Sequence, residues 1–144
     1  MKIYTFGAED APVLLLLPGT CCHWKSNFGA VIPLLADSFR VLCVSYDGFD
    51  ETEQTEFPTM LEETKKIEAY LKNHCGGHIR AAYGCSLGGS FVGLLVARQK
   101  ACDNGRCKIY NPDFPDVIAL QQQLLPAGER YLDLMETFLQ RNGI

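Results

Sequence analysis

Short apolar runs recur along the first hundred residues and are separated by stretches of mixed polarity. Val13–Leu17 is apolar throughout and stops at Pro18, and residues 40–46 are rich in Val, Leu and Cys. Uninterrupted apolar runs of this length are typical of strands that are buried on both faces, as in the middle of a parallel sheet. Residues 3–6 and 79–83 are further strand candidates. The pattern therefore predicts a sheet that is mainly parallel.

Helical patterns lie between these runs. Residues 28–36 carry apolar side chains at helical spacing after Ser26 and Asn27, which can cap a helix, and residues 87–100 form another apolar helical stretch. Strands that alternate with helices form an α/β protein, with helices on both faces of the sheet. We therefore predict an α/β fold, a three-layer sandwich with a mainly parallel central sheet.

A third helix begins at a capping box. Thr59 and Glu62 have the spacing of this motif, and the helix is expected to reach about Asn73 before Gly76 ends it. Its charged side chains are expected on a solvated face without catalytic meaning. They are Glu62, Glu63, Lys65, Lys66 and Glu68.

The strongest chemical signal is the sequence Gly84-Cys85-Ser86-Leu87-Gly88, which reads G-x-S-x-G and lies between a predicted strand and a predicted helix. A sharp strand-to-helix turn needs small residues around its central serine, because the turn pushes the hydroxyl out above the sheet. Ser86 is therefore the candidate nucleophile. The alternative is a turn whose glycines serve only packing.

A glycine loop follows the predicted strand Val13–Leu17. Loops at the carboxyl ends of parallel strands share one rim of the sheet, so Gly19 and Thr20 are expected beside the Ser86 turn. The backbone N–H groups of Thr20 and Leu87 would then form an oxyanion hole, where one donor is worth about 3 kcal/mol. The alternative is an ordinary loop.

Together these segments resemble the α/β-hydrolase family over residues 3–100. The resemblance rests on VLLLLPGT (strand and oxyanion loop), FRVLCVSYDGFDET (next strand and acidic turn) and IRAAYGCSLGGSFVGLLVAR (elbow strand and helix). Pro18-Gly19 stands where the family often has His-Gly. The resemblance implies a serine hydrolase that acts on a small-molecule ester or acyl substrate through Ser86, without a cofactor.

The family's catalytic histidine normally follows the elbow helix, and no histidine follows Ser86 in this chain. His74 and His78 precede the elbow strand, whose length places them about 20 Å from Ser86. His23 is predicted on the active-site rim and is therefore the candidate general base. Asp113 is the candidate triad acid, and Asp47 stays open as an alternative.

The 144 residues, 47% of them hydrophobic, suit a single domain with one core. Members of the resembled family usually have more strands, so we expect a shortened α/β-hydrolase-like sheet followed by an atypical, mostly helical segment over residues 101–144. The shortened sheet would end in an exposed edge, which invites a homodimer unless the helices over residues 116–142 cover it.

The composition argues against several kinds of binding partner. The net charge of −4 and the absence of a basic patch argue against nucleic acid, and the apolar runs are too short to cross a membrane. The chain starts without an apolar signal region, so a cytoplasmic location is expected. The seven cysteines form no disulfide framework, and Cys102 and Cys107 lack further ligands nearby, so no metal site is expected.

The missing downstream histidine keeps a second class of function open. The chain could be a hydrolase-like domain without chemistry that serves as a binding or interaction module. It could also be a shortened chain whose missing strands come from a partner.

Overall fold

The computed structural model describes residues 1–98, which form a four-stranded sheet in the order β1-β3-β2-β4. β2 pairs in parallel with both β3 and β4, and only β1 runs antiparallel, along β3. The predicted mainly parallel sheet is confirmed. The strands are β1 (Lys2–Phe6), β2 (Val13–Leu17), β3 (Arg40–Ser45) and β4 (Ala81–Gly84).

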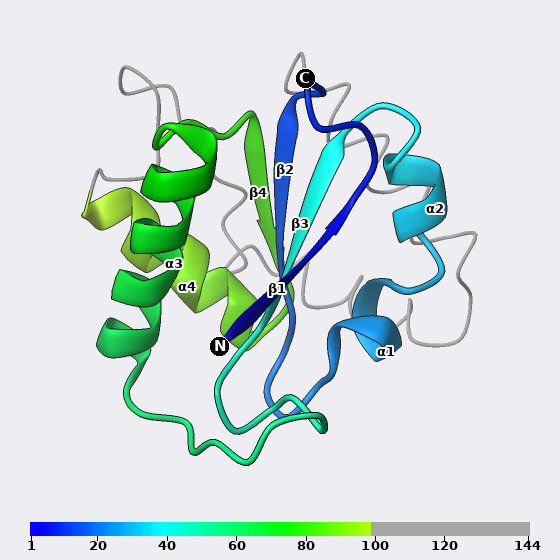
Figure 1. Cartoon of the computed structure of the whole chain (residues 1–144). Coiled ribbons are helices and arrows are strands. Elements are labelled where there is room, and N and C mark those ends of the chain that lie inside the picture. The colour runs from blue at the N-terminus through cyan, green and yellow to red at the C-terminus, as the bar shows by residue number, and fades with distance from the viewer. Residues whose placement is uncertain (99–144) are drawn as a thin grey trace.

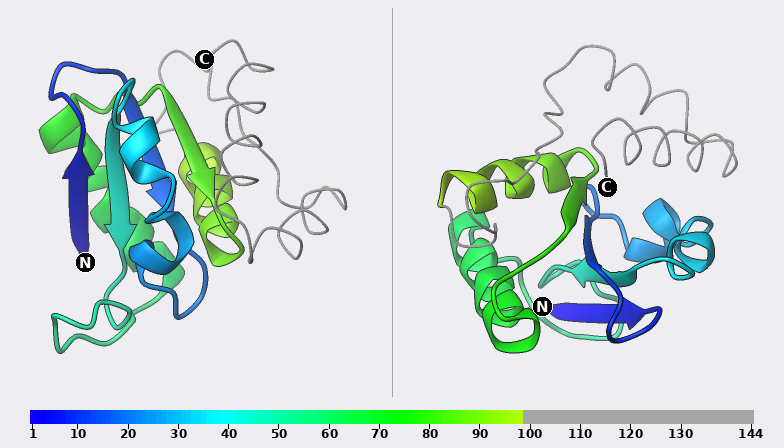
Figure 2. Two further views of the ribbon diagram at one scale, coloured as in Figure 1. Left: turned by 90° about the vertical axis from the view of Figure 1, so that its right-hand side faces the viewer. Right: turned by 90° about the horizontal axis from the view of Figure 1, so that it is seen from above.

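Helices cover both faces of this sheet, as the predicted three-layer sandwich requires. α3 and α4 lie on one face, and the short helices α1 and α2 lie on the other (Figures 1 and 2). The helices are α1 (Trp24–Phe28), α2 (Ile32–Leu35), α3 (Met60–Cys75) and α4 (Leu87–Ala97).

The central strand β2 contributes to two hydrophobic cores, because successive side chains of a strand point to opposite faces. Leu14 and Leu16 pack with α1 and α2, and Leu15 and Leu17 pack with α3 and α4. All four are at most 1% exposed. Burial on both faces explains why this segment is apolar at every position.

The predicted single helix over residues 28–36 is wrong, since two short helices lie in this region. α1 begins earlier than predicted, with His23 at its N-cap, and α2 begins anew with Pro33 in its first turn. Proline fits there because it has no N–H to donate to the preceding turn. Asn27 therefore lies inside α1 and does not cap it.

α3 begins at the predicted capping box, but two of its charged side chains lie where the prediction does not put them. The Thr59 hydroxyl accepts from Glu62 N–H at 3.2 Å. The prediction of a solvated charged face is wrong for Glu63 and Glu68, which are 0% and 8% exposed. Glu63 Oε1 accepts from Asp47 N–H at 2.8 Å, and Glu68 pairs with Arg98 at 2.6 Å, so both carboxylates have partners that make burial tolerable.

β4 is bonded to β2 on one side, and no strand within residues 1–98 pairs with its other side. The homodimer through this edge stays a prediction. Asp113, Cys102, Cys107 and the segment over residues 101–144 lie outside the described residues. None of the helices in residues 1–98 has both the length and the apolar composition that crossing a membrane requires.

Candidate active site

The carboxyl ends of β2, β3 and β4 meet at the lower rim of the sheet in Figure 1, and in the left view of Figure 2 the arrows of β3 and β4 point to this rim, opposite to that of β1. β2 leads into Pro18 and Gly19, β3 into Tyr46 and Asp47, and β4 into Ser86. The topology therefore brings the glycine loop and the serine turn together, as the sequence predicts.

Ser86 joins β4 to α4 in a strained backbone conformation. Its φ is 51° and its ψ is −115°, a region that residues with a side chain rarely adopt. Such a conformation costs about 1–3 kcal/mol and persists only where the surrounding structure enforces it. The residue is exposed and precedes the first turn of α4. Ser86 thus lies in a sharp strand-to-helix turn, as the motif predicts.

Two glycines of the motif make this turn possible. A methyl group on Gly84 would lie 2.2 Å from the carbonyl of Gly88, and one on Gly88 would lie 1.9 Å from the carbonyl oxygen of Leu17. Either contact is far inside van der Waals distance. The absence of side chains at Gly84 and Gly88 lets α4 begin directly against β2 and β4, with Ser86 above them.

The glycine loop after β2 adjoins the serine. A methyl group on Gly19 would lie 3.5 Å from Cβ of Ser86. The N–H of Gly19 donates to Asn27 Oδ1 at 2.7 Å. By contrast, no hydrogen bond among residues 1–98 uses the N–H of Thr20 or Leu87. Leu87 follows Ser86 in the chain and Thr20 follows Gly19, so each predicted oxyanion donor is the neighbour of a residue at this junction, and neither N–H has an acceptor within residues 1–98.

His23 contacts a residue of β1. Its ring centroid lies 6.1 Å from that of Tyr4 on β1, and its Nδ1 accepts from Lys25 N–H at 3.3 Å. β1 and Ser86's strand β4 are three strand spacings apart, or about 14 Å. A neutral imidazole whose Nδ1 accepts carries its proton on Nε2. The structure does not bring His23 to Ser86 through any contact among the described residues, and its role as base stays a prediction.

The other two histidines lie beyond the opposite end of β4. His74 stacks on Tyr70 near the end of α3, and His78 lies in the turn that precedes β4. The elbow strand separates both from Ser86, as predicted.

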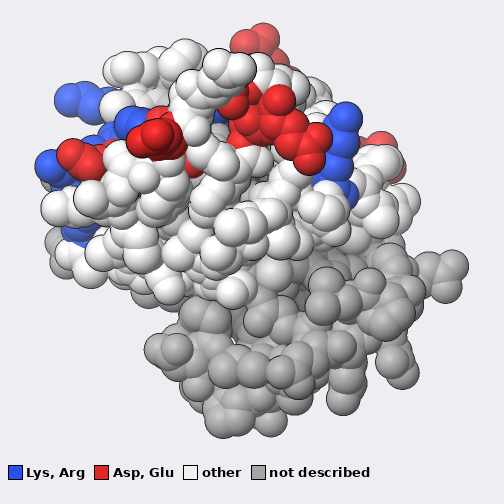
Figure 3. Space-filling view, turned by 90° about the horizontal axis from the view of Figure 1, so that it is seen from below, with Lys and Arg blue, Asp and Glu red and all other residues white. Residues whose placement is uncertain are grey.

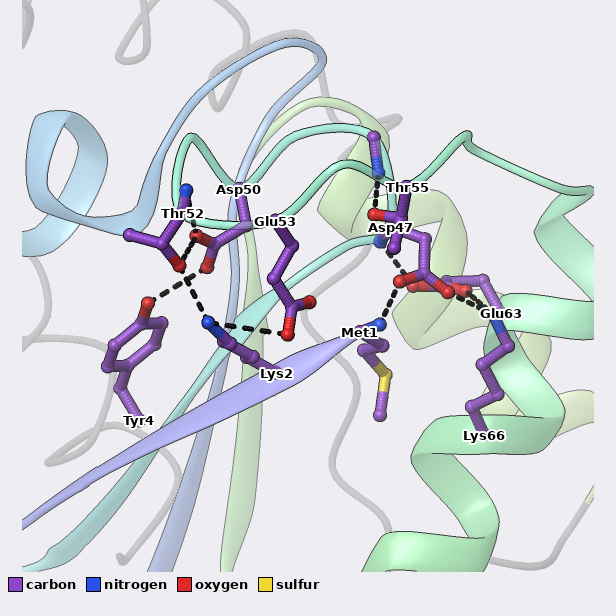
Figure 4. A network of polar contacts seen from close by, with 11 residues as sticks. Met1, Lys2, Tyr4, Asp47, Asp50, Thr52, Glu53, Thr55, Glu63 and Lys66 are labelled. Atoms are coloured by element: carbon purple, nitrogen blue, oxygen red, sulfur yellow. Dashed lines mark hydrogen bonds and ion pairs between the residues drawn. The ribbon is translucent and has the colours of Figure 1, made fainter.

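Asp47, the alternative acid, is held in an ion-pair network (Figure 4). Its carboxylate binds the Met1 ammonium and Lys66, and Lys66 also pairs with Glu63 at 2.9 Å. Burial raises the pKa of Asp47, but the hydrogen bonds from Lys66 and the N-terminal ammonium outweigh it and hold the pKa below its usual value. These contacts hold the carboxylate in place where β1, β3 and α3 meet.

A second buried carboxylate lies nearby in the same view (Figure 4). Asp50 accepts from the Tyr4 hydroxyl and from Thr52 N–H, each at 2.9 Å. Burial raises the pKa of Asp50, but hydrogen bonds from Thr52 and Tyr4 lower it well below the usual value. Asp50 therefore fixes the loop after β3 against β1.

Seen from below, acidic side chains gather along one side of the rim, with basic side chains near both ends of the group (Figure 3). Glu51 and Glu56 are two exposed acidic residues of the loop after β3. A face of this kind repels polyanions at low ionic strength.

Two polar residues at the rim make hydrogen bonds with the glycine loop that the sequence does not predict. Asn27 accepts from Gly19 N–H, and the Tyr46 hydroxyl donates to the Pro18 carbonyl at 3.1 Å. Asn27 was interpreted as a helix cap, and its loop contact has no sequence signature. Tyr46 offered one signal, because a tyrosine that ends a buried strand needs an acceptor for its hydroxyl.

No protein-family model matches the sequence, and no curated protein matches it. Solved structures do. An alpha/beta hydrolase family protein from Desulfitobacterium hafniense superposes with a TM-score of 0.66 at 24% identity, over 70% of this chain and 40% of its own. The described residues form the N-terminal portion of an α/β-hydrolase fold.

Two further structures agree on this fold. The 2-hydroxy-6-oxo-6-phenylhexa-2,4-dienoate hydrolase from Rhodococcus sp. strain RHA1 has a TM-score of 0.54 at 27% identity, over 70% of this chain and 39% of its own. A lipase-esterase related protein from Clostridium acetobutylicum has a TM-score of 0.56 at 20% identity, over 70% and 43%. This α/β-hydrolase-like chain thus spans about two fifths of the length of the structures that it resembles.

Proposed function

We propose that this chain carries the nucleophile of a serine hydrolase and that Ser86 attacks a small-molecule ester or acyl substrate. The observation that carries the proposal is the strained backbone of Ser86, with φ 51° and ψ −115°, at the junction of β4 and α4. A conformation that costs free energy is found mainly where function requires it. The fold adds support, because it is shared with proteins named as hydrolases and as lipase-esterase related.

The reaction would proceed in two displacements. Ser86 Oγ attacks the carbonyl carbon and passes its proton to a general base, while the N–H groups of Thr20 and Leu87 stabilise the oxyanion. The alcohol leaves with a proton from that base, and water then hydrolyses the acyl-enzyme to the carboxylic acid and free Ser86. The sequence predicts His23 as this base and Asp113 as its partner, whereas the contacts of His23 with Tyr4 and Lys25 favour a base other than His23.

Hydrolysis of p-nitrophenyl acetate by the full chain tests this proposal. Ser86→Ala should remove turnover above the rate of buffer alone. Ser90→Ala is the matched control, since Ser90 is exposed on the first turns of the same helix and should retain wild-type turnover. Equal turnover in wild type and Ser86→Ala would show that Ser86 is not the nucleophile.

One observation favours a second function. No histidine contacts Ser86 among residues 1–98, and none follows it in the sequence. A wild-type chain that neither turns over esters nor reacts at Ser86 would therefore be a hydrolase-like binding module, or a portion completed by further strands.

A further inference from the structure

One peptide group of the glycine loop is hydrogen-bonded at both ends by side chains. The Tyr46 hydroxyl donates to the Pro18 carbonyl oxygen at 3.1 Å, and the Gly19 N–H donates to Asn27 Oδ1 at 2.7 Å. The carbonyl and the N–H belong to the same planar unit, the peptide bond between Pro18 and Gly19. Both residues are buried. The two side chains thus hold one peptide plane from two elements, the end of β3 and helix α1.

Tyr46 is itself enclosed by other residues. It is 0% exposed, and its ring stacks on Phe91 of α4 with centroids 4.6 Å apart and planes 19° apart. Phe49 closes another side, edge-on at 5.7 Å. A buried hydroxyl needs a hydrogen-bond partner, and the Pro18 carbonyl supplies it. Through Tyr46, the helix that follows Ser86 is therefore connected to the loop that faces Ser86.

The bond to Asn27 decides which amide of the loop is available. Each residue carries one backbone N–H, and that of Gly19 is already donated to Asn27. The next N–H along the chain belongs to the exposed Thr20 and has no acceptor among the described residues. Rotation of the Pro18–Gly19 peptide would break both side-chain bonds and release the Gly19 N–H from Asn27.

We propose that Tyr46 and Asn27 are positioning residues that lock the Pro18–Gly19 peptide, so that the Thr20 N–H and not the Gly19 N–H serves the oxyanion. The inference rests on the proposed function of Ser86. It assigns to each side chain a part in catalysis that is exerted through the backbone, without contact with substrate. Burial raises the pKa of Tyr46 well above its ordinary value, so the phenol keeps its proton and donates at neutral pH.

Hydrogen exchange of the Gly19 amide, read by NMR on the full chain, tests the lock without any need for activity. Asn27→Ala should speed exchange by about tenfold or more, because the loss of about 1.4 kcal/mol of protection equals a factor of ten. Asn27→Asp keeps an Oδ acceptor and should keep the protection. Asn73→Ala, at an exposed position near the end of α3, is the matched control. Exchange in Asn27→Ala within about twofold of wild type would overturn the lock.

The rate constant of fluorophosphonate labelling tests the positioning. The reagent's phosphoryl oxygen would occupy the oxyanion hole, so Asn27→Ala and Tyr46→Phe should each lower the first-order rate constant at saturation by about tenfold or more. The half-saturating concentration should stay near the wild-type value. A residue that serves only stability would lower the amount of protein that reacts and leave this rate constant unchanged. Tyr70→Phe, on α3, is the control for the loss of a hydroxyl.

The outcomes separate this inference from the proposed function. Labelling of wild type at Ser86 with unchanged rate constants in Asn27→Ala and Tyr46→Phe would overturn the positioning role and leave Ser86 as nucleophile. No labelling of wild type would reject the proposed function and with it the catalytic role of the lock. The Gly19 exchange would then still decide whether the peptide is held by Asn27.

Discussion

Gly88 approaches Leu17 so closely that a methyl group on the glycine would lie 1.9 Å from the leucine carbonyl oxygen. The contact joins the first turn of α4 to the end of β2, and so fixes where the serine turn stands relative to the glycine loop. Because the obstacle is backbone, no rotation of a side chain can relieve it.

Gly88→Ala should therefore destabilise the protein by about 3 kcal/mol or more, since overpacking against backbone forces α4 away from β2. Gly93→Ala, on the same helix, has nothing within 4 Å of the added carbon and should be neutral or stabilising by up to about 1 kcal/mol. Urea unfolding followed by circular dichroism measures both. Similar losses in the two variants would contradict the close contact.

His23→Asn should leave the rate of Ser86 labelling within about threefold of wild type. The reason is that the His23 ring contacts Tyr4 and caps α1 through Lys25 N–H, a bond that asparagine can also accept. A general base contributes about 100-fold or more. A loss of that size, with an unchanged melting temperature, would establish His23 as the base that the sequence predicts.

Asp47→Asn should lower the free energy of unfolding by about 1–3 kcal/mol at pH 7, because Asp47 binds Lys66 and the Met1 ammonium from a buried position. The folded-state pKa of Asp47 lies below its value of about 3.9 in an unfolded chain. The stabilisation is therefore present above about pH 4 and is lost as the pH falls through the folded-state pKa.

Urea unfolding at pH 7 and at pH 3 measures this effect, with Asp37→Asn at an exposed site as the control. The difference between wild type and Asp47→Asn should shrink at the lower pH, while the control should match wild type at both. A difference that is independent of pH would show that the ion pairs of Asp47 do not contribute.

The sheet and the serine turn could be predicted because their signals are local. Val13–Leu17 is apolar at every position since it is buried on both faces, and the G-x-S-x-G motif lies within five residues, with Gly84 in close contact with Gly88. The position of Gly19 beside Ser86 followed from the rule that parallel strands end at one rim.

The errors came from contacts between segments far apart in sequence. Glu63 is buried because Asp47, 16 residues away, donates its N–H to it, and no pattern within α3 indicates that partner. Asn27 has the composition of a helix cap, yet its acceptor is used by Gly19 in a loop before the helix. The contact between His23 and Tyr4 likewise has no sequence signal, because it depends on the pairing of β1 with β3, and the predicted role of His23 as base stays a prediction.

The most direct test of the account is the site of covalent reaction with a fluorophosphonate. The full chain is incubated with the reagent, and the modified residue is located by mass spectrometry of its peptides. The account predicts a single phosphonylated serine, Ser86, and no adduct in Ser86→Ala. No reaction at Ser86 in the folded wild type, or a modification that persists at equal level in Ser86→Ala, would contradict it.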